Sequence, residues 1–174
     1  QVQQPIDEYL ELFFHYLSDA KNSSPKTIEN YALRLGRFVE FVGPLEPKQL
    51  LALHILNFRL SLKKRWLSIK TINYHIVSIR SFLKFLLRND IDTLAPDKCD
   101  LSKIDPHEVS YLTEEELDDL LSAPYRFETK ELAQTRDAAL LSFLFSTWLR
   151  VSELIALTKD RIRADSNQLT VIGK

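Results

Sequence analysis

Apolar residues recur along the first half of the chain at the spacing of an α-helix. Ile6, Leu10, Phe13 and Leu17 follow one another at intervals of four, three and four residues. The same period returns in three later segments, so the sequence predicts four amphipathic helices, over residues 6–20, 25–42, 47–64 and 68–88. Because four such helices can bury their apolar faces against one another, we predict a small bundle over residues 1–90.

A different pattern follows this bundle. Residues 91–112 contain two prolines, five acidic residues and no helical period, which is typical of a linker. Thr113 then starts a capping box with Glu116, and we expect Pro124 to stop the helix that begins there. Helices are also predicted over residues 131–147 and 151–157, and a β-strand over 168–172. The predicted fold is therefore mainly α: a four-helix bundle, a linker, and the beginning of an α+β domain over residues 113–174.

The composition excludes several classes of protein. With 3 Gly in 174 residues there is no glycine-rich loop to bind a nucleotide phosphate, and with 1 Cys there is neither a disulfide framework nor a cysteine-based metal site. The 4 His have no metal-ligand spacing, so we expect no metal and no cofactor. No apolar run reaches the roughly 20 residues of a membrane span, and we expect a cytoplasmic protein. Because the chain starts at Gln1 and has 0 Met, we expect it to be an excerpt of a longer protein.

Positive charge is concentrated in one block of the chain. The formal net charge is only −1, but residues 21–89 hold 13 basic and three acidic side chains, a net charge of +10. Such a block is a candidate surface for a polyanion, and the alternative is a solvated basic face balanced by acidic neighbours.

The second and fourth predicted helices each combine an apolar stripe with a cationic one. Lysine and arginine neutralise phosphates, and short polar side chains can bond phosphates or base edges, so double-stranded DNA is the expected partner. An α-helix also fits the major groove of B-DNA. The candidate DNA-binding residues are Lys26, Thr27, Asn30, Arg34, Arg37, Lys63, Lys64, Lys70, Thr71, Asn73, Arg80 and Lys84. We expect Trp66, between these helices, to pack in a loop rather than to stack on a base.

The most specific motif reads Ser146-Thr147-Trp148-Leu149-Arg150-Val151-Ser152-Glu153-Leu154, and Val171-Ile172-Gly173-Lys174 follows it. Together they resemble the tyrosine recombinases, the DNA strand-exchange enzymes of the phage-integrase and Xer type. That family carries a T-G-L-R-[VI]-S-E-L box with a catalytic arginine, matched by Arg150, and a V-x-G-K strand end with a catalytic lysine, matched by Lys174. The segment from Ser24 to Tyr31 is similar to the start of a helix in the family's SAM-like core-binding domain. The resemblance therefore covers nearly the whole chain.

The resemblance implies a metal-free transesterification at a DNA phosphate. A tyrosine attacks phosphorus, forms a 3′-phosphotyrosyl link and releases a 5′-hydroxyl; Arg150 would stabilise the equatorial oxygens, and Lys174 would protonate the leaving oxygen. In the intact protein the implied partners are other recombinase protomers, in a tetramer on DNA. All 6 Tyr precede Arg150, whereas the family's nucleophile follows it, so we expect this chain alone to be inactive.

One position departs from the family box, and two other readings of the chain stay open. Trp148 stands where the box has glycine, which allows a tight turn; the tryptophan either packs into the domain core or marks a diverged member. Arg150 could instead serve only as an ion-pair partner of Glu153 or Asp137, acidic residues that we interpret as structural supports. The other readings are a non-catalytic DNA-binding protein derived from an integrase, and a helical adaptor with an incidental basic face.

Overall fold

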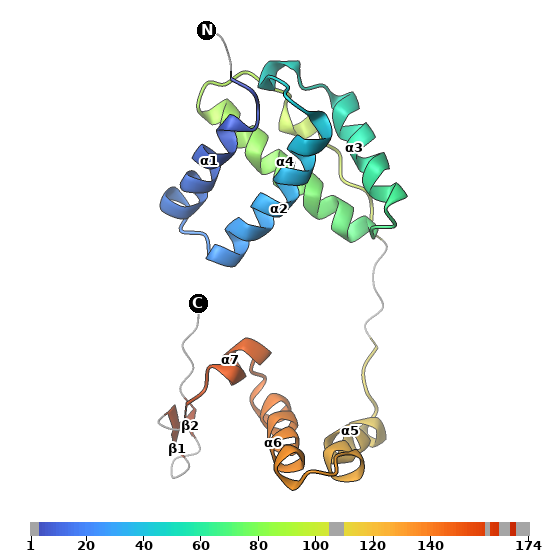
Figure 1. Cartoon of the computed structure of the whole chain (residues 1–174). Coiled ribbons are helices and arrows are strands. Elements are labelled where there is room, and N and C mark those ends of the chain that lie inside the picture. Colours follow the sequence, from blue (N-terminus) through green and yellow to red (C-terminus); the bar gives the residue numbers. More distant parts are fainter. Residues whose placement is uncertain (1–3, 105–109, 159–160, 164–167, 170–174) are drawn as a thin grey trace. The chain divides into compact units, whose positions relative to one another are not determined.

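The computed structural model describes residues 4–104, 110–158, 161–163 and 168–169 (Figure 1). The chain divides into two compact units, residues 1–106 and residues 107–174. Each unit is described by itself below.

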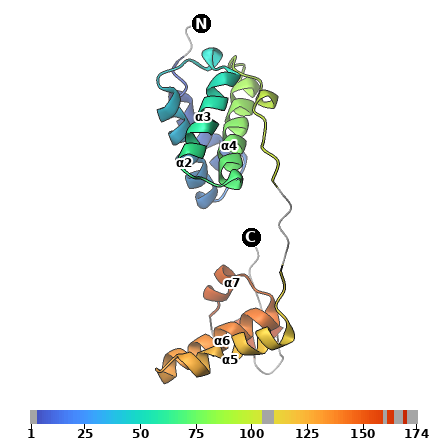
Figure 2. The same cartoon turned by 90° about the vertical axis from the view of Figure 1, so that its right-hand side faces the viewer.

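The first unit contains the four predicted helices. They are α1 (Glu8–His15), continued by the π-helical turn η1 (Tyr16–Ala20), then α2 (Pro25–Val42), α3 (Ala52–Lys64) and α4 (Ile69–Arg88). The third helix is shorter than predicted, because residues 47–49 form a separate 3₁₀ turn, η2 (Pro47–Gln49). Figure 2 shows α2, α3 and α4 side by side.

Serine caps set where the two basic helices begin. The hydroxyl of Ser24 accepts the backbone N–H of Thr27 at 3.3 Å, and that of Ser68 accepts the N–H of Thr71 at 3.1 Å. Each bond satisfies one of the N–H groups that the first turn of a helix leaves without a partner.

The core of this unit is apolar and rich in aromatic rings. Phe13 of α1 is fully buried, with ring centroids 5.3 Å from both Phe82 and Phe85 of α4 and 5.6 Å from Tyr31 of α2. On the α3 side, Phe58 and Phe38 lie 5.2 Å apart. The predicted stripe of α4 is buried throughout, at Ile72, Ile76, Ile79, Leu83 and Leu86. These contacts confirm the predicted bundle.

The predicted linker is wrong for residues 91–102. This segment carries the 3₁₀ turn η3 (Pro96–Lys98) and packs on the bundle, with Leu94 and Cys99 inside the apolar cluster. The Thr93 hydroxyl donates to the carbonyl of Pro47 at 3.0 Å. Burial raises the pKa of the Cys99 thiol to about 11, so it stays protonated at neutral pH. The sequence did not indicate that this segment packs on the bundle, because its few apolar residues follow neither a helical nor a strand period.

The second unit contains α5 (Glu114–Phe127), α6 (Glu131–Thr147), α7 (Val151–Ile155) and two short strands, β1 (Ile162–Arg163) and β2 (Gln168–Leu169). The strands pair antiparallel, with Ile162 opposite Leu169 and Arg163 opposite Gln168. Only the first two residues of the predicted strand over 168–172 lie within the described part, and both are in β2.

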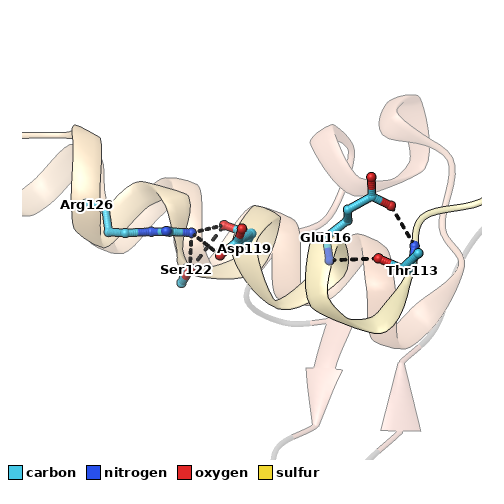
Figure 3. A network of polar contacts seen from close by, with 5 residues as sticks. All are labelled: Thr113, Glu116, Asp119, Ser122 and Arg126. Atoms are coloured by element: carbon cyan, nitrogen blue, oxygen red, sulfur yellow. Dashed lines mark hydrogen bonds and ion pairs between the residues drawn. The ribbon is translucent and has the colours of Figure 1, made fainter.

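The start of α5 follows the prediction and its end does not (Figure 3). The Thr113 hydroxyl accepts from the Glu116 N–H at 3.2 Å, and the Glu116 carboxylate accepts from the Thr113 N–H at 2.8 Å. Pro124 lies inside the helix, which runs on to Phe127. Arg126 donates to the carbonyl and the carboxylate of Asp119 and to the Ser122 hydroxyl, so it braces the helix across the proline.

None of the helices in the described part of the chain is both long enough and apolar enough to cross a membrane.

Candidate nucleic-acid interface and arginine box

A groove lies on the first unit between the first half of α2 and the second half of α4. We call it the basic groove. Its residues come from two adjoining hollows that share Tyr31, Ser81 and Lys84. They are Tyr16, Leu17, Lys21, Ser23, Thr27, Tyr31, Val77, Arg80, Ser81, Lys84, Phe85 and Arg88.

The two helices run past each other in opposite directions along this groove. Thr27 shares a hollow with Lys84, Tyr31 shares one with Val77, and the Arg34 guanidinium lies 5.2 Å from the ring centroid of Tyr74. From Thr27 to Arg34 the α2 side of the groove extends over seven residues of helix, about 10 Å at the α-helical rise. That length is comparable to the roughly 12 Å width of the B-DNA major groove.

The charge along the groove is positive. Lys21, Arg80, Lys84 and Arg88 line it, and no carboxylate does among the residues that the structure describes. Arg80 has a carboxylate neighbour outside the groove, Asp97, with 3.7 Å between guanidinium nitrogen and carboxylate oxygen. Because the Asp97 side chain is almost fully exposed, this pair is screened by water and leaves most of the positive field in place.

The predicted DNA-binding residues fall into several places. Thr27, Arg80 and Lys84 line the groove, and Arg34 follows on α2 with its guanidinium over the Tyr74 ring. Arg37 lines a separate hollow between α2 and α3, with Glu40 and Arg65. A second set lies around the turn between α3 and α4, and a third lies on the first turns of α2. The second set is Lys63, Lys64, Lys70 and Thr71, and the third is Lys26 and Asn30.

The position of Asn73 differs from the prediction that it lies on the DNA-binding surface, because its side chain does not face solvent. Its side chain is 7% exposed and its amide is fully occupied by the segment after η3. Nδ2 donates to the Ser102 carbonyl at 2.8 Å, and Oδ1 accepts the Ser102 N–H at 3.0 Å. Arg59 donates to the carbonyl of Asp100 and to the Ser102 hydroxyl beside it. Asn73 thus anchors the returning chain and is not a DNA contact.

Several of the other polar candidates are also occupied locally. The Thr27 hydroxyl is paired with that of Ser24 at 2.9 Å, and the Thr71 hydroxyl with that of Ser68 at 2.8 Å. The Asn30 amide donates to the carbonyl of Lys26 at 2.8 Å. These bonds belong to helix starts, so the short polar residues are engaged within their own helices.

Sequence reasoning missed four residues of this face. Lys21, Tyr31 and Arg88 line the basic groove, and Arg65 shares a hollow with Arg37 and Glu40. Arg88 follows Lys84 by one helical turn, a signal that was available from the sequence. Lys21 lies before α2 and outside any helical period, so only the fold brings it to the groove.

A buried histidine lies under the same face. His75 is 2% exposed, its Nδ1 lies 3.0 Å from the Thr71 carbonyl oxygen, and its Nε2 has no hydrogen-bond partner within the described structure. Burial lowers the pKa of His75, and the nearby charges of Arg37 and Arg34 lower it further. Trp66, by contrast, is 95% exposed, so the prediction that it packs in a loop is wrong.

The arginine box lies in the second unit, where α6 turns into α7. Arg150 is the N-cap residue of α7, and its side chain is 81% exposed. Its guanidinium donates to one oxygen of Glu153 at 2.8 Å, and its backbone N–H donates to the other at 2.8 Å. These bonds lower the pKa of the Glu153 carboxyl, the backbone N–H having the larger effect. Glu153 therefore holds Arg150 in place while the outer part of the guanidinium stays open to solvent.

The remaining residues of the box resolve two expectations. Trp148 adopts the left-handed conformation that a glycine would favour, with φ 57° and ψ 22°, and its side chain is 89% exposed rather than packed in a core. Asp137 pairs with Arg136 at 2.7 Å instead of supporting Arg150. Lys174 lies outside the described residues. Among the residues described, no cluster of His, Cys, Asp or Glu could hold a metal ion.

The sequence is similar to those of known proteins over nearly its whole length. Residues 10–90 match the phage integrase N-terminal SAM-like domain. The tyrosine recombinase XerC of Roseiflexus castenholzii is 33% identical over 97% of this chain and 54% of its own length. The tyrosine recombinase XerD of Chlorobaculum tepidum is 33% identical over 99% of this chain and 58% of its own. A solved XerA recombinase has 26% identity and a TM-score of 0.44, covering 95% of this chain and 54% of its own.

The chain spans about half the length of the curated relatives it matches. The match to the SAM-like domain covers the basic groove, and the Xer relatives extend the similarity through the arginine box. Residues 10–90 therefore match the phage integrase N-terminal SAM-like domain, in a chain that is similar to Xer tyrosine recombinases over nearly its whole length.

Proposed function

We propose that this chain is the DNA-binding and partial catalytic portion of a tyrosine recombinase that cleaves and rejoins double-stranded DNA through a phosphotyrosyl intermediate. The single observation that carries the proposal is the groove between α2 and α4, which cations line and no described carboxylate enters. It lies inside the segment that matches the SAM-like domain of phage integrases.

The groove would bind the phosphate backbone. Lys21, Lys84 and Arg88 offer positive charge in the groove, and Arg34 adds to it from α2. Release of condensed counterions by these cations would supply most of the affinity. Arg34 is held over Tyr74, so its guanidinium loses less freedom on binding than an unsupported side chain would.

The second unit would contribute to the chemistry. When the nucleophilic tyrosine attacks phosphorus, negative charge grows on the equatorial oxygens, and the exposed guanidinium of Arg150 can donate two N–H groups to them. Glu153 orients Arg150 from one side, which lowers the cost of ordering it in the transition state. We assign to Lys174 the proton transfer to the leaving 5′-oxygen, from its place in the V-x-G-K motif.

Two further proposals follow from the family likeness. The six tyrosines all precede Arg150, so none is assigned as the nucleophile and the 174 residues alone should bind DNA without forming a covalent adduct. The intact protein would act as a tetramer on DNA and, as an enzyme of chromosomal or phage DNA, in the cytoplasm.

The test compares two double charge reversals in the same unit. Arg34→Glu with Lys84→Glu changes the groove, whereas Lys98→Glu with Lys103→Glu makes the same change in net charge outside it. In titrations of a labelled duplex at several salt concentrations, the groove variant should lose most of its affinity. Its salt slope should also fall by about 0.9 for each phosphate contact removed.

The control variant should bind like the unmodified chain, and circular dichroism should show unchanged helicity in both variants. Equal losses in the two variants would mean that only the overall charge matters, and unchanged affinity in the groove variant would refute the assignment.

A further inference from the structure

The turn between α3 and α4 combines three features that folding does not explain. Its central residue, Trp66, has φ 60°, is 95% exposed, and follows the cations Lys63, Lys64 and Arg65. Lys70 comes four residues later, and no acidic residue occurs anywhere from residue 47 to residue 89.

The backbone of the turn requires a left-handed residue at position 66. The N–H of Trp66 bonds the Lys63 carbonyl at 3.0 Å, and the N–H of Leu67 reaches back to the Leu62 carbonyl at 3.5 Å. This is the Schellman ending of a helix, in which glycine is the usual left-handed residue. At the end of α4 the same arrangement is filled by Asp90, with φ 59°. A bulky aromatic residue in this conformation is uncommon and strained.

The Trp66 side chain makes no packing contact that would stabilise the fold. At 95% exposure its ring packs on neither the core nor a neighbouring helix, although this unit has a well-closed core. Glycine would therefore suit the turn better than tryptophan in both conformation and exposure. Strained residues that the fold itself does not need tend to occur where a protein contacts a ligand.

The surrounding charge selects the kind of ligand. Lys63, Lys64, Arg65 and Lys70 are all exposed, so a cationic partner is disfavoured and a polyanion is favoured. Arg65 also shares a hollow with Arg37 and Glu40, which places the turn next to the second half of α2. A large aromatic ring beside a cationic track adds apolar contact area and an indole N–H donor to a surface that binds phosphates through charge.

We propose that Trp66 is a DNA-contacting residue that packs its indole against the nucleic acid at the turn between α3 and α4. The inference rests on the proposed DNA-binding function and adds a contact of a different physical kind. Phosphate contacts release counterions and depend on salt, whereas an aromatic contact does not. The two kinds can therefore be separated by experiment.

The chain provides its own matched control, because its two tryptophans have nearly the same backbone conformation and nearly the same solvent exposure. Trp148 has φ 57° and is 89% exposed, in the other unit. In Trp148→Gly, Trp66 is the sole tryptophan, and in Trp66→Gly it is Trp148. Both substitutions relieve a left-handed tryptophan, so neither should lower the melting temperature.

The test titrates the whole 174-residue chain with a random-sequence duplex and follows both labelled DNA and tryptophan emission. In Trp148→Gly, saturating DNA should quench Trp66 and shield it from acrylamide. Trp66→Gly should bind about tenfold more weakly at every salt concentration, with an unchanged salt slope, because the variant loses the apolar area that the indole buries on the DNA. Trp66→Phe should restore most of the affinity, and Trp148→Gly should bind normally.

Two results would overturn the inference while leaving the proposed function standing: unchanged Trp66 emission on saturating DNA, or normal affinity of Trp66→Gly. A Trp66→Gly variant that binds DNA normally but changes its oligomeric state would assign the residue to a protein contact instead. If the unmodified chain does not bind the duplex at all, the proposed function itself fails, and the inference fails with it.

Discussion

The two units of the chain differ in how they bury their apolar residues. In the first unit, eighteen side chains form one buried cluster. In the second, Ala138 and Pro124 are the only buried residues among those described, while Phe127, Leu132 and Ile155 are each at least 76% exposed. Apolar burial is the main favourable term in the free energy of folding. The core of the first unit therefore stabilises that unit, whereas the second unit buries little of its own apolar surface.

This difference separates two roles within one chain. The unit with the closed core presents a rigid cationic surface, on which positions of charges are set by packing. The unit with exposed apolar faces holds the arginine box on a short helix, where one ion pair orients the arginine. Affinity for DNA is therefore expected to depend on the first unit and the chemistry on the second.

The largest effect on the free energy of unfolding is expected from truncating a core side chain of the first unit. Phe13→Ala removes a fully buried ring that contacts both α2 and α4, and should lower the free energy of unfolding by about 3–5 kcal/mol. Phe127→Ala, at an 80% exposed ring in the second unit, should change it by less than about 0.5 kcal/mol. Denaturant titrations followed by circular dichroism measure both. Similar losses in the two variants would show that the units share one core.

The next effect concerns Arg150 in the whole protein. Arg150→Lys keeps the positive charge but loses the two parallel N–H donors of the guanidinium. This variant should slow DNA cleavage on the order of 10²–10³-fold. Affinity should change little, because the guanidinium lies in the unit without the basic groove. Cleavage of a suicide substrate and duplex binding are measured in one preparation, with thermal unfolding as the control.

Normal cleavage by Arg150→Lys would make Arg150 a structural partner of Glu153. It would also favour the reading of the chain as a diverged, non-catalytic DNA-binding protein, in which Trp148 marks a lost active site.

A smaller effect tests the new assignment of Asn73. Asn73→Ala leaves the N–H and the carbonyl of Ser102 without their partner, which should cost about 1–3 kcal/mol of stability. Measured below the melting transition, DNA affinity should match that of the unmodified chain. A loss of affinity with unchanged stability would return Asn73 to the DNA-binding surface.

The smallest effect is a pH dependence from His75. Burial and two arginines lower its pKa in the folded chain below the ordinary value of about 6.5. The unfolded chain therefore binds a proton first as the pH falls, so this contribution to stability is complete above about pH 6.5 and is lost as the pH drops toward the folded pKa. The free energy of unfolding should fall from pH 7.5 to pH 5.5 more steeply in the unmodified chain than in His75→Leu. Equal slopes would mean that the other histidines and the carboxylates account for the change.

The helices of the first unit were predictable because their signals are local. The apolar period in α2 and α4 and the serine caps at Ser24 and Ser68 act within one or two turns, so the sequence alone determined where these helices lie. The capping box at Thr113 was found for the same reason. The arginine box was recognised from its residues, and its position at the start of α7 followed.

What only the tertiary structure decided involves partners far apart in the chain. Asn73 faces Ser102, 29 residues away, so no periodicity could show that this polar side chain of α4 points inward. Lys21 reaches the groove beside Lys84 and Arg88 because the bundle closes. Local propensity determines where elements begin and end, whereas burial and long-range hydrogen bonds depend on how those elements pack. The packing of the bundle determines which cations line the groove, and it leaves Trp66 exposed.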